Sequence, residues 1–180
     1  MVGKCGAKWR FALRFCHIRK SSTICTMAQL LGEFDSRIDA KGRFNFPAGL
    51  RRQLPPEAND SFVVNRGFES CLVLYPRPVW DEVAARINQL NPFVKEHRAF
   101  TRYFFRGATE LRLDNAQRLL LPKKLMEYAG IEKELVLFAH TNKIELWSAD
   151  RYEHMLDEAP LDFATLAEKV MGPSNPSESL

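Results

Sequence analysis

The sequence predicts an α+β fold that is mainly β and is built from two tandem copies of one motif. Residues 38–50 have a counterpart at residues 113–125, in which Asp, Arg, Pro and Leu coincide at four positions and apolar residues coincide at three more. In each copy a short stretch alternates as a strand does, and a proline and a helix-like segment follow it. The repeat and the alternation together predict this class.

The first copy begins with two strands joined by a tight turn. We expect one strand at 34–38 and a second at 43–46, whose alternation puts its two phenylalanines on one face. Gly42 suits the turn between them, because glycine tolerates a positive φ. Pro47, and Pro122 in the second copy, stand where the first position of a helix would be, since that position needs no N–H donor.

A hairpin completes each copy. Residues 62–64 align with 137–139 at the same spacing of 75 positions, and 72–75 align with 144–147 at a spacing of 72. Gly130 predicts the end of the short helix in the second copy. Four short strands cannot bury a core alone, so we expect the two copies to close on each other.

Helices are expected after each hairpin. An amphipathic stripe with spacings of 3, 4 and 3 residues follows Pro78, at Trp80, Val83, Ile87 and Leu90. We expect further helices at 93–106, after Ser148 as N-cap, and at 162–171, and a polar tail at 173–180. The chain then divides into a first repeat, connecting helices, a second repeat, and a C-terminal helix with its tail, at 31–78, 79–107, 108–152 and 153–180.

The first 26 residues differ from the rest of the chain. They carry six basic side chains and no acid, a charge of +6, whereas the other 154 residues hold 20 basic and 22 acidic side chains and sum to −2. Three of the four cysteines also lie in this leader 1–26. We interpret the leader as a mis-assigned start ahead of Met27, with a genuine basic arm or a targeting segment as alternatives. A single cysteine in the body fits a reducing compartment.

Composition and motifs exclude several classes of protein. With 46% hydrophobic and 27% charged residues, the chain is not disordered, collagen-like or a disulfide miniprotein, and no apolar run reaches the about 18–20 residues that span a bilayer. His97, His140 and His154 lack metal-ligand spacing, and no phosphate loop or nucleophile elbow is present. Cys71 lies among apolar residues and indicates a packing thiol. We therefore expect no enzyme activity, cofactor, metal, small-molecule substrate or membrane partner.

Two Asp-x-x-x-Arg motifs, Asp39 to Arg43 and Asp114 to Arg118, are each followed by an apolar triplet and a proline. With the segments Cys-Leu-Val-Leu-Tyr-Pro and Glu-Leu-Trp-Ser of the two hairpins, they resemble the MraZ family of bacterial transcriptional regulators. The resemblance covers about residues 29–155. Gln117 replaces the turn glycine in the second motif, so we expect that turn to differ in type, and the leader has no counterpart in the family.

The resemblance implies fold and function together. It implies two tandem AbrB-like domains of the SpoVT-AbrB type that form a swapped-hairpin β-barrel with flanking helices. It further implies a ring-shaped homo-oligomer that binds short direct repeats in double-stranded promoter DNA. The regulator so implied is cytoplasmic and nucleoid-associated, acts on the cell-division and cell-wall gene cluster, and is usually a repressor.

The DNA-binding residues that we expect surround the two motifs. The resemblance puts the first motif at the DNA surface, where Lys41 suits a phosphate contact and the planar fork of Arg43 suits a guanine. Nearby basic residues either add phosphate contacts or form a solvated face: Arg37, Arg51 and Arg52. Asp39 and Asp114 are expected to pair with an arginine and fix each turn.

The second motif allows two interpretations. Arg118 either forms a structural pair with Asp114, which we favour, or contacts DNA. Lys123 and Lys124 occupy the first turn of a predicted helix, where positive charge opposes the helix dipole. This unfavourable placement favours a functional role for them at the DNA surface.

A basic stripe on the predicted helix at 93–106 is formed by Lys95, Arg98, Arg102 and Arg106. It either faces DNA or is a solvated face that pairs with acids of a neighbouring subunit, and we favour the second interpretation. A different class of function also stays open, an AbrB-fold protein-interaction scaffold or antitoxin-like partner. The acidic stretch between Asp150 and Asp162 would suit that role.

Overall fold

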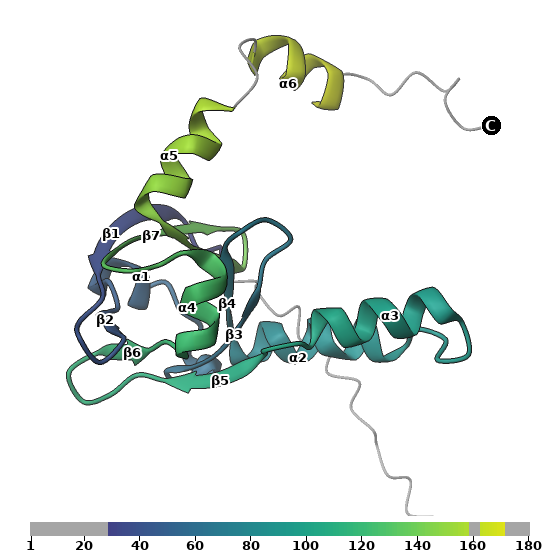
Figure 1. Cartoon of the computed structure of the whole chain (residues 1–180), viewed down its shortest axis with the longest axis horizontal. Helices are drawn as coiled ribbons and strands as arrows, with labels where there is room; N and C mark the ends of the chain where they lie inside the picture. Colours follow the sequence, from purple (N-terminus) through teal and green to yellow (C-terminus); the bar gives the residue numbers. More distant parts are fainter. Residues whose placement is uncertain (1–28, 159–162, 172–180) are drawn as a thin grey trace, which may run out of the picture.

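Two copies of one unit form the body of the protein in the computed structural model, which describes residues 29–158 and 163–171 (Figure 1). The first copy contains β1 (Gly32–Arg37), β2 (Arg43–Asn45), α1 (Ala48–Arg51), the 3-10 turn η1 (Pro56–Ala58), β3 (Ser61–Arg66) and β4 (Leu72–Pro76). The second contains β5 (Thr109–Arg112), β6 (Arg118–Leu120), α4 (Lys123–Ala129), β7 (Glu134–His140) and β8 (Lys143–Ser148). The leader and the predicted tail at 173–180 lie outside the described residues.

The strands of the two copies interleave. Six of them form one antiparallel sheet in the order β1-β7-β8-β4-β3-β5, and β2 and β6 form a separate two-stranded ribbon. Each strand of the first copy has a partner from the second, in the pairs β1–β7, β2–β6, β3–β5 and β4–β8. The predicted α+β class and the closing of the two copies on each other are therefore confirmed.

The barrel implied by the resemblance does not close. β1 and β5 are the two edges of the six-stranded sheet, and the β2–β6 ribbon is not part of it. β1 meets β2 only next to the turn, at an isolated bridge between Ile38 and Phe44. Farther along, the Asn45 carbonyl accepts a hydrogen bond from the Ser36 hydroxyl (3.1 Å) instead of from a backbone N–H, so the ladder between β1 and β2 ends.

The core lies between the sheet and the inner face of the ribbon. Phe44 and Leu119 face each other across β2 and β6 and are 1% and 0% exposed. They belong to one cluster with inward side chains of the sheet such as Phe62, Leu74 and Leu146. Burial of these large apolar side chains is the main stabilisation of the fold, and it holds the inner face of the ribbon in place.

Each ribbon strand leads into a short helix. Pro47 and Pro122 are the N-cap residues of α1 and α4, with φ of −60° and −62°, so each helix begins one residue later than predicted. Gly130 ends α4 with a φ of 66°, as the sequence predicts.

Further helices follow each copy: α2 (Arg77–Asn88) and α3 (Lys95–Phe104) after the first, and α5 (Ala149–Asp157) and α6 (Phe163–Met171) after the second. Trp80 of α2 and its counterpart Tyr152 of α5 are both buried. Trp80 stacks on Phe104 with ring centroids 5.7 Å apart, which holds α3 to α2. Ser148 stands at the N-cap of α5, but its side chain makes no capping hydrogen bond. None of the helices that the structure describes is long and apolar enough to cross a membrane.

Candidate nucleic-acid interface

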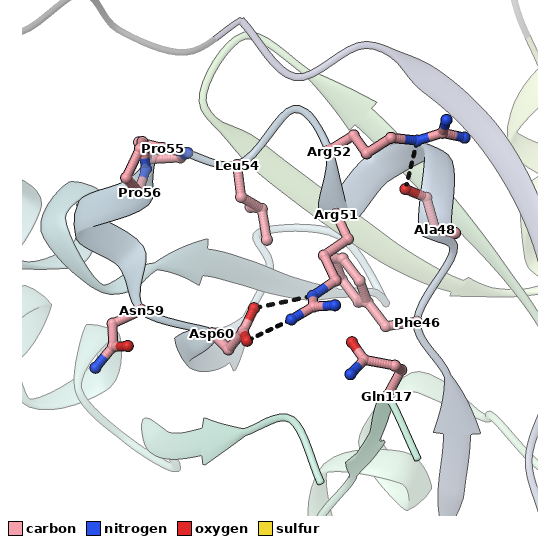
Figure 2. Close-up of a pocket in the computed structure, with 10 residues that line it drawn as sticks. All are labelled: Phe46, Ala48, Arg51, Arg52, Leu54, Pro55, Pro56, Asn59, Asp60 and Gln117. Atoms are coloured by element: carbon pink, nitrogen blue, oxygen red, sulfur yellow. Dashed lines mark hydrogen bonds and ion pairs between the residues drawn. The ribbon is translucent and has the colours of Figure 1, made fainter. Parts of the chain in front are cut away.

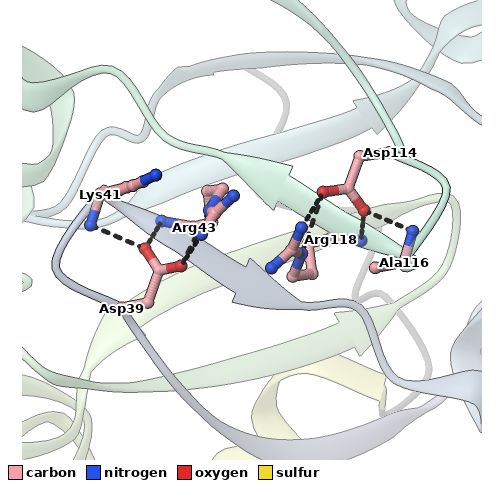
Figure 3. Close-up of polar contacts among 6 residues, drawn as sticks. All are labelled: Asp39, Lys41, Arg43, Asp114, Ala116 and Arg118. Atoms are coloured by element: carbon pink, nitrogen blue, oxygen red, sulfur yellow. Dashed lines mark hydrogen bonds and ion pairs between the residues drawn. The ribbon is translucent and has the colours of Figure 1, made fainter.

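The first turn, residues 39–42, is built around the carboxylate of Asp39 (Figure 3). Its Oδ1 accepts hydrogen bonds from the backbone N–H groups of Lys41 (2.8 Å) and Arg43 (3.0 Å). Its Oδ2 accepts a hydrogen bond from Nε of the Arg43 side chain (2.8 Å) and forms an ion pair with Nη2 of the same side chain (2.7 Å). The bond from the Arg43 side chain is the main reason why the pKa of Asp39 falls to about 2.

The second turn, residues 114–117, repeats this arrangement. Asp114 accepts from the N–H groups of Ala116 (2.8 Å) and Arg118 (2.9 Å) and from the Arg118 side chain, which lowers its pKa. Gln117 has a φ of 61° and Gly42 a φ of 82°, so both occupy the left-handed region. The expected difference in turn type is therefore wrong, because the aspartate bonds and the ribbon hold Gln117 in a conformation that glycine adopts more easily.

The outer face of the ribbon carries the arginines of both turns. In the β2–β6 register Arg43 faces Leu120 and Asn45 faces Arg118, so these four side chains share the face opposite to Phe44 and Leu119. We call these four residues the ribbon face. Figure 3 shows its two arginines lying between the two aspartates. Two guanidinium groups are thus held at a set spacing on one rigid surface.

Each arginine binds its aspartate through one edge of the guanidinium group and has a second edge available for another acceptor. In both Arg43 and Arg118, Nε donates a hydrogen bond to the aspartate and Nη2 forms an ion pair with it. No described residue accepts a hydrogen bond from Nη1 of either side chain. A guanidinium has five N–H donors in a planar fork, so the Nη1–Nη2 edge can still bind two acceptors. The structural pair and the nucleic-acid contact that the sequence left as alternatives are therefore compatible.

Interleaving brings each turn beside the helix of the other copy. Lys41 and Gly42 of the first turn line a pocket of about 840 Å³ together with Lys123 and Met126 of α4. The carbonyl of Gly42 accepts from the N–H of Leu121 at 2.9 Å, which ties the first turn to the second copy. Lys41 and Lys123 therefore come from distant parts of the sequence to line one pocket. Lys124 follows on the same helix and is exposed.

The second turn lies beside α1 in a related way. Gln117 lines a pocket of about 530 Å³ with Arg51 and Arg52, and Figure 2 shows its amide across the pocket from Arg51. Arg51 donates to both carboxylate oxygens of Asp60, at 3.1 and 2.7 Å, and this pairing lowers the pKa of Asp60. The sequence groups Arg51 and Arg52 with the first turn, but the structure puts them in the pocket that Gln117 lines.

The remaining predicted cation of the first copy, Arg37, is exposed at the end of β1. Its Nη2 lies 3.0 Å from Oε1 of Glu134 on β7. It lines a shallow pocket with Asp39 and Ala40 of the first turn, so it is near that turn but paired with an acid. Such an exposed ion pair contributes little to stability, and its arginine can exchange partners.

Comparison with known proteins assigns this arrangement to a family. A family model described as "MraZ protein, putative antitoxin-like" matches residues 30–103 and 104–172. A protein of Christiangramia forsetii named Transcriptional regulator MraZ is 44% identical over 147 residues, which is 81% of this chain and 95% of the relative. Proteins of the same name from Cytophaga hutchinsonii (42% identical, 79% and 95% covered) and Flavobacterium psychrophilum (40% identical, 84% and 98% covered) also match. The chain belongs to the MraZ family.

The MraZ relatives are named as transcriptional regulators, which are not a class of enzyme. Among the residues that the structure describes, no three His, Cys, Asp or Glu side chains gather as metal ligands do. Cys71 is fully buried beside Trp147 and Tyr152, and burial raises the pKa of its thiol to about 12. Its predicted role in packing is confirmed.

Two members of the ribbon face of this MraZ chain were not singled out from the sequence. Asn45 is exposed next to Arg43, and the alternation that assigns Arg43 to the outer face also assigns Asn45 to it. Leu120 is 54% exposed, although it stands between two buried leucines. Three consecutive leucines at 119–121 hide the alternation, so only the strand register reveals that the middle one faces outward.

Proposed function

We propose that this MraZ-family chain is a sequence-specific DNA-binding regulator of transcription whose ribbon face enters the major groove. The observation that carries the proposal is the pair of aspartate-held arginines on one outer face of a two-stranded antiparallel ribbon. The major groove of B-form DNA admits such a ribbon, and base edges there carry a code that side chains can distinguish. A held arginine costs less entropy to order on binding than a free one.

Roles can be proposed for each position of the ribbon face. The Nη1–Nη2 edges of Arg43 and Arg118 suit O6 and N7 of guanine, and the amide of Asn45 suits adenine. Leu120 offers an exposed apolar contact for a thymine methyl group. Lys41, Lys123 and Lys124 suit phosphates, which position the protein without reading sequence.

The target that we propose, following the family resemblance, is a set of short direct repeats upstream of the cell-division and cell-wall genes. Several copies of the chain in a homo-oligomeric ring would engage successive repeats, and the outcome would be repression by a cytoplasmic, nucleoid-associated protein. One ribbon offers few contacts, so linked copies would raise the affinity through a high effective concentration.

The test is binding of the full chain to a duplex with the repeats from upstream of its own gene, compared with a scrambled duplex, over a salt series. We expect selective binding that weakens steeply with salt. Arg43→Ala and Arg118→Ala should each lower the affinity for the repeats by roughly 5- to 150-fold, since a bidentate arginine–guanine contact is worth about 1–3 kcal/mol. Arg86→Ala, an exposed arginine of α2, is the matched control and should bind as the wild type does.

Equal binding to the repeats and to the scrambled duplex would refute sequence-specific regulation through this face. Loss on Arg43→Ala without loss on Arg118→Ala would restrict the contact to the first turn. Thermal unfolding of each variant separates a lost contact from a lost fold, because each substitution also leaves an aspartate without its arginine.

A second function is supported by one finding, the words antitoxin-like in the description of the family model. A chain of that kind would work as a protein-interaction scaffold or antitoxin-like partner, and its acidic stretch between Asp150 and Asp162 would suit such a role. Binding to a protein partner need not depend on Arg43 or fall steeply with salt, so the same titration distinguishes the two functions.

A further inference from the structure

Two helices of the chain carry long stripes of opposite charge. The basic stripe on α3 and directly after it consists of Lys95, Arg98, Arg102 and Arg106, with spacings of 3, 4 and 4 residues. The acidic stripe on α5 consists of Asp150, Glu153 and Asp157, with spacings of 3 and 4 residues. All seven residues are exposed. Such spacings put each set along one side of its helix, over two turns or more.

Within residues 29–158 and 163–171, neither stripe finds a partner of opposite charge. Among the described residues, none of the seven side chains forms an ion pair, and Arg98 donates only to the carbonyl of Pro92 (2.9 Å). Figure 1 shows why: α3 projects to the right of the sheets, whereas α5 rises from their upper side. The two stripes of one chain therefore lie apart.

Both stripes lie on faces that the described part of the chain leaves exposed, although Arg98 and Arg102 also line a small pocket with the end of α2. On α3, the half-buried positions His97, Thr101 and Phe104 mark the side that packs inward, and the basic stripe avoids them. On α5, Tyr152 is buried against the sheet and the acidic stripe lies on other sides of the helix. Each stripe is thus open to a second molecule.

We infer that the acidic stripe of α5 on one copy of this chain docks on the basic stripe of α3 on a second copy. The inference deepens the ring assembly proposed above and rests on it for its biological meaning. The two stripes follow different repeats of the same chain, so the contact is head-to-tail and each copy has one free stripe of each sign. A repeated head-to-tail contact closes into a ring when its rotation brings the last copy back to the first, and otherwise it builds an open filament.

Apolar side chains flank the charges. Phe93, just before α3, is 90% exposed, and Leu156 on α5 is 52% exposed. Exposed ion pairs contribute little one by one. Several pairs in register, together with buried aromatic surface, give an interface both its specificity and its stability.

The experiment reverses each stripe and then both together, in the full chain, with mass measured by sedimentation over a range of concentration and salt. The basic-stripe variant is Lys95→Glu with Arg102→Glu, and the acidic-stripe variant is Glu153→Lys with Asp157→Lys. Each should weaken assembly by about tenfold or more, because like charges then meet across the contact. The chain that carries all four substitutions has complementary stripes again and should recover assembly. Recovery also proves that the substituted helices fold.

The matched control reverses two exposed cations outside the stripes, Arg86→Glu with Lys133→Glu, and should assemble as the wild type does. Assembly of either stripe variant at wild-type strength would overturn the inference, and so would a fourfold variant that stays dissociated. A wild-type chain that is monomeric throughout the range would overturn it as well.

Binding to a duplex with a single repeat separates this inference from the proposed function. Dissociated stripe variants that still bind one repeat through Arg43 would support both. A wild-type chain that assembles through the stripes but binds no DNA would support the contact between the stripes and refute the proposed DNA-binding function. If Lys95→Glu with Arg102→Glu stays assembled and loses affinity for a single repeat, the basic stripe faces DNA instead, and the inference is wrong.

Discussion

The two turns of the ribbon share one hydrogen-bonding scheme and differ in charge. In both, an aspartate accepts from two backbone N–H groups and from the arginine four residues later. The first turn adds Lys41, whose counterpart is Ala116, so with its Asp–Arg pair it carries a net +1 and the second turn carries none. The duplicated scheme orients an arginine twice, whereas long-range attraction for phosphate arises in one turn only.

The turns differ also in the residue at the left-handed position. Gly42 takes its φ of 82° without strain, but Gln117 adopts a φ of 61° with a side chain whose Oε1 is buried and has no hydrogen-bond partner among the described residues. An unsatisfied buried acceptor and a left-handed side chain both cost free energy. The second turn is therefore the more strained copy of the same scheme.

The largest expected effect comes from changing the residue at the left-handed position of each turn. Gly42→Ala should lower the free energy of unfolding by about 1–3 kcal/mol, because a left-handed φ strains an alanine. Its Cβ would also stand 3.3 Å from the Leu121 carbonyl. Gln117→Gly should leave the free energy of unfolding unchanged or raise it by up to about 1 kcal/mol, since it removes the strain. Urea unfolding of both variants measures the difference.

The position-matched control is Ala40→Gly, in the same turn and exposed, which should have a small effect. If Gly42→Ala and Gln117→Gly destabilise the protein equally, the left-handed conformation is not what distinguishes the two turns.

The next effect is on stability in acid. Because bonds from arginine hold the pKa of Asp39 at about 2 and that of Asp114 below its usual range, each carboxylate stabilises the fold at neutral pH. Unfolded aspartate has a pKa of about 3.9, so this contribution is complete above that value and is lost as the pH falls through the lower folded pKa. Asp39→Asn and Asp114→Asn should each lower the melting temperature at pH 7 and flatten its fall between about pH 4 and pH 2.

Melting temperatures measured across that pH range test the equivalence of the two pairs. The double variant carries both Asp39→Asn and Asp114→Asn. If its melting temperature falls between pH 4 and pH 2 as steeply as that of the wild type, other carboxylates determine stability in acid. If Asp39→Asn flattens this fall of the melting temperature and Asp114→Asn does not, only the first Asp–Arg pair persists in solution.

Much of the fold could be predicted from local signals in the sequence. The elements begin and end close to the positions expected from the repeat spaced by 75 residues, the two prolines and Gly130. These signals are local, because each acts on the backbone within a few residues. Spatial neighbours could not be predicted in the same way. Arg51 lies eight residues after Arg43 in sequence, yet it lines the pocket beside Gln117, because interleaved strands exchange the helices of the two copies.

The candidate site shows the same division. The two Asp–Arg pairs could be predicted because both partners lie within one turn. Lys41 and Lys123 line the same pocket because β2 pairs with β6, and that pairing joins residues about 75 positions apart. No pattern of hydrophobicity encodes which strand of one copy pairs with which strand of the other, so this part of the site emerges only from the register.

The smallest effect concerns the charge difference itself. Lys41→Ala removes an exposed ammonium but keeps the backbone N–H that Asp39 accepts, so the turn should fold normally. If Lys41 contacts a phosphate, the slope of log affinity against log salt should become shallower by about 1, with little change in preference among sequences. Ala116→Lys should make the slope steeper by about 1 if the second turn also reaches a phosphate. The slope could also stay unchanged in Ala116→Lys while it becomes shallower in Lys41→Ala. That result would mean that only the first turn contacts the DNA backbone and that the second turn orients its arginine for the fold alone.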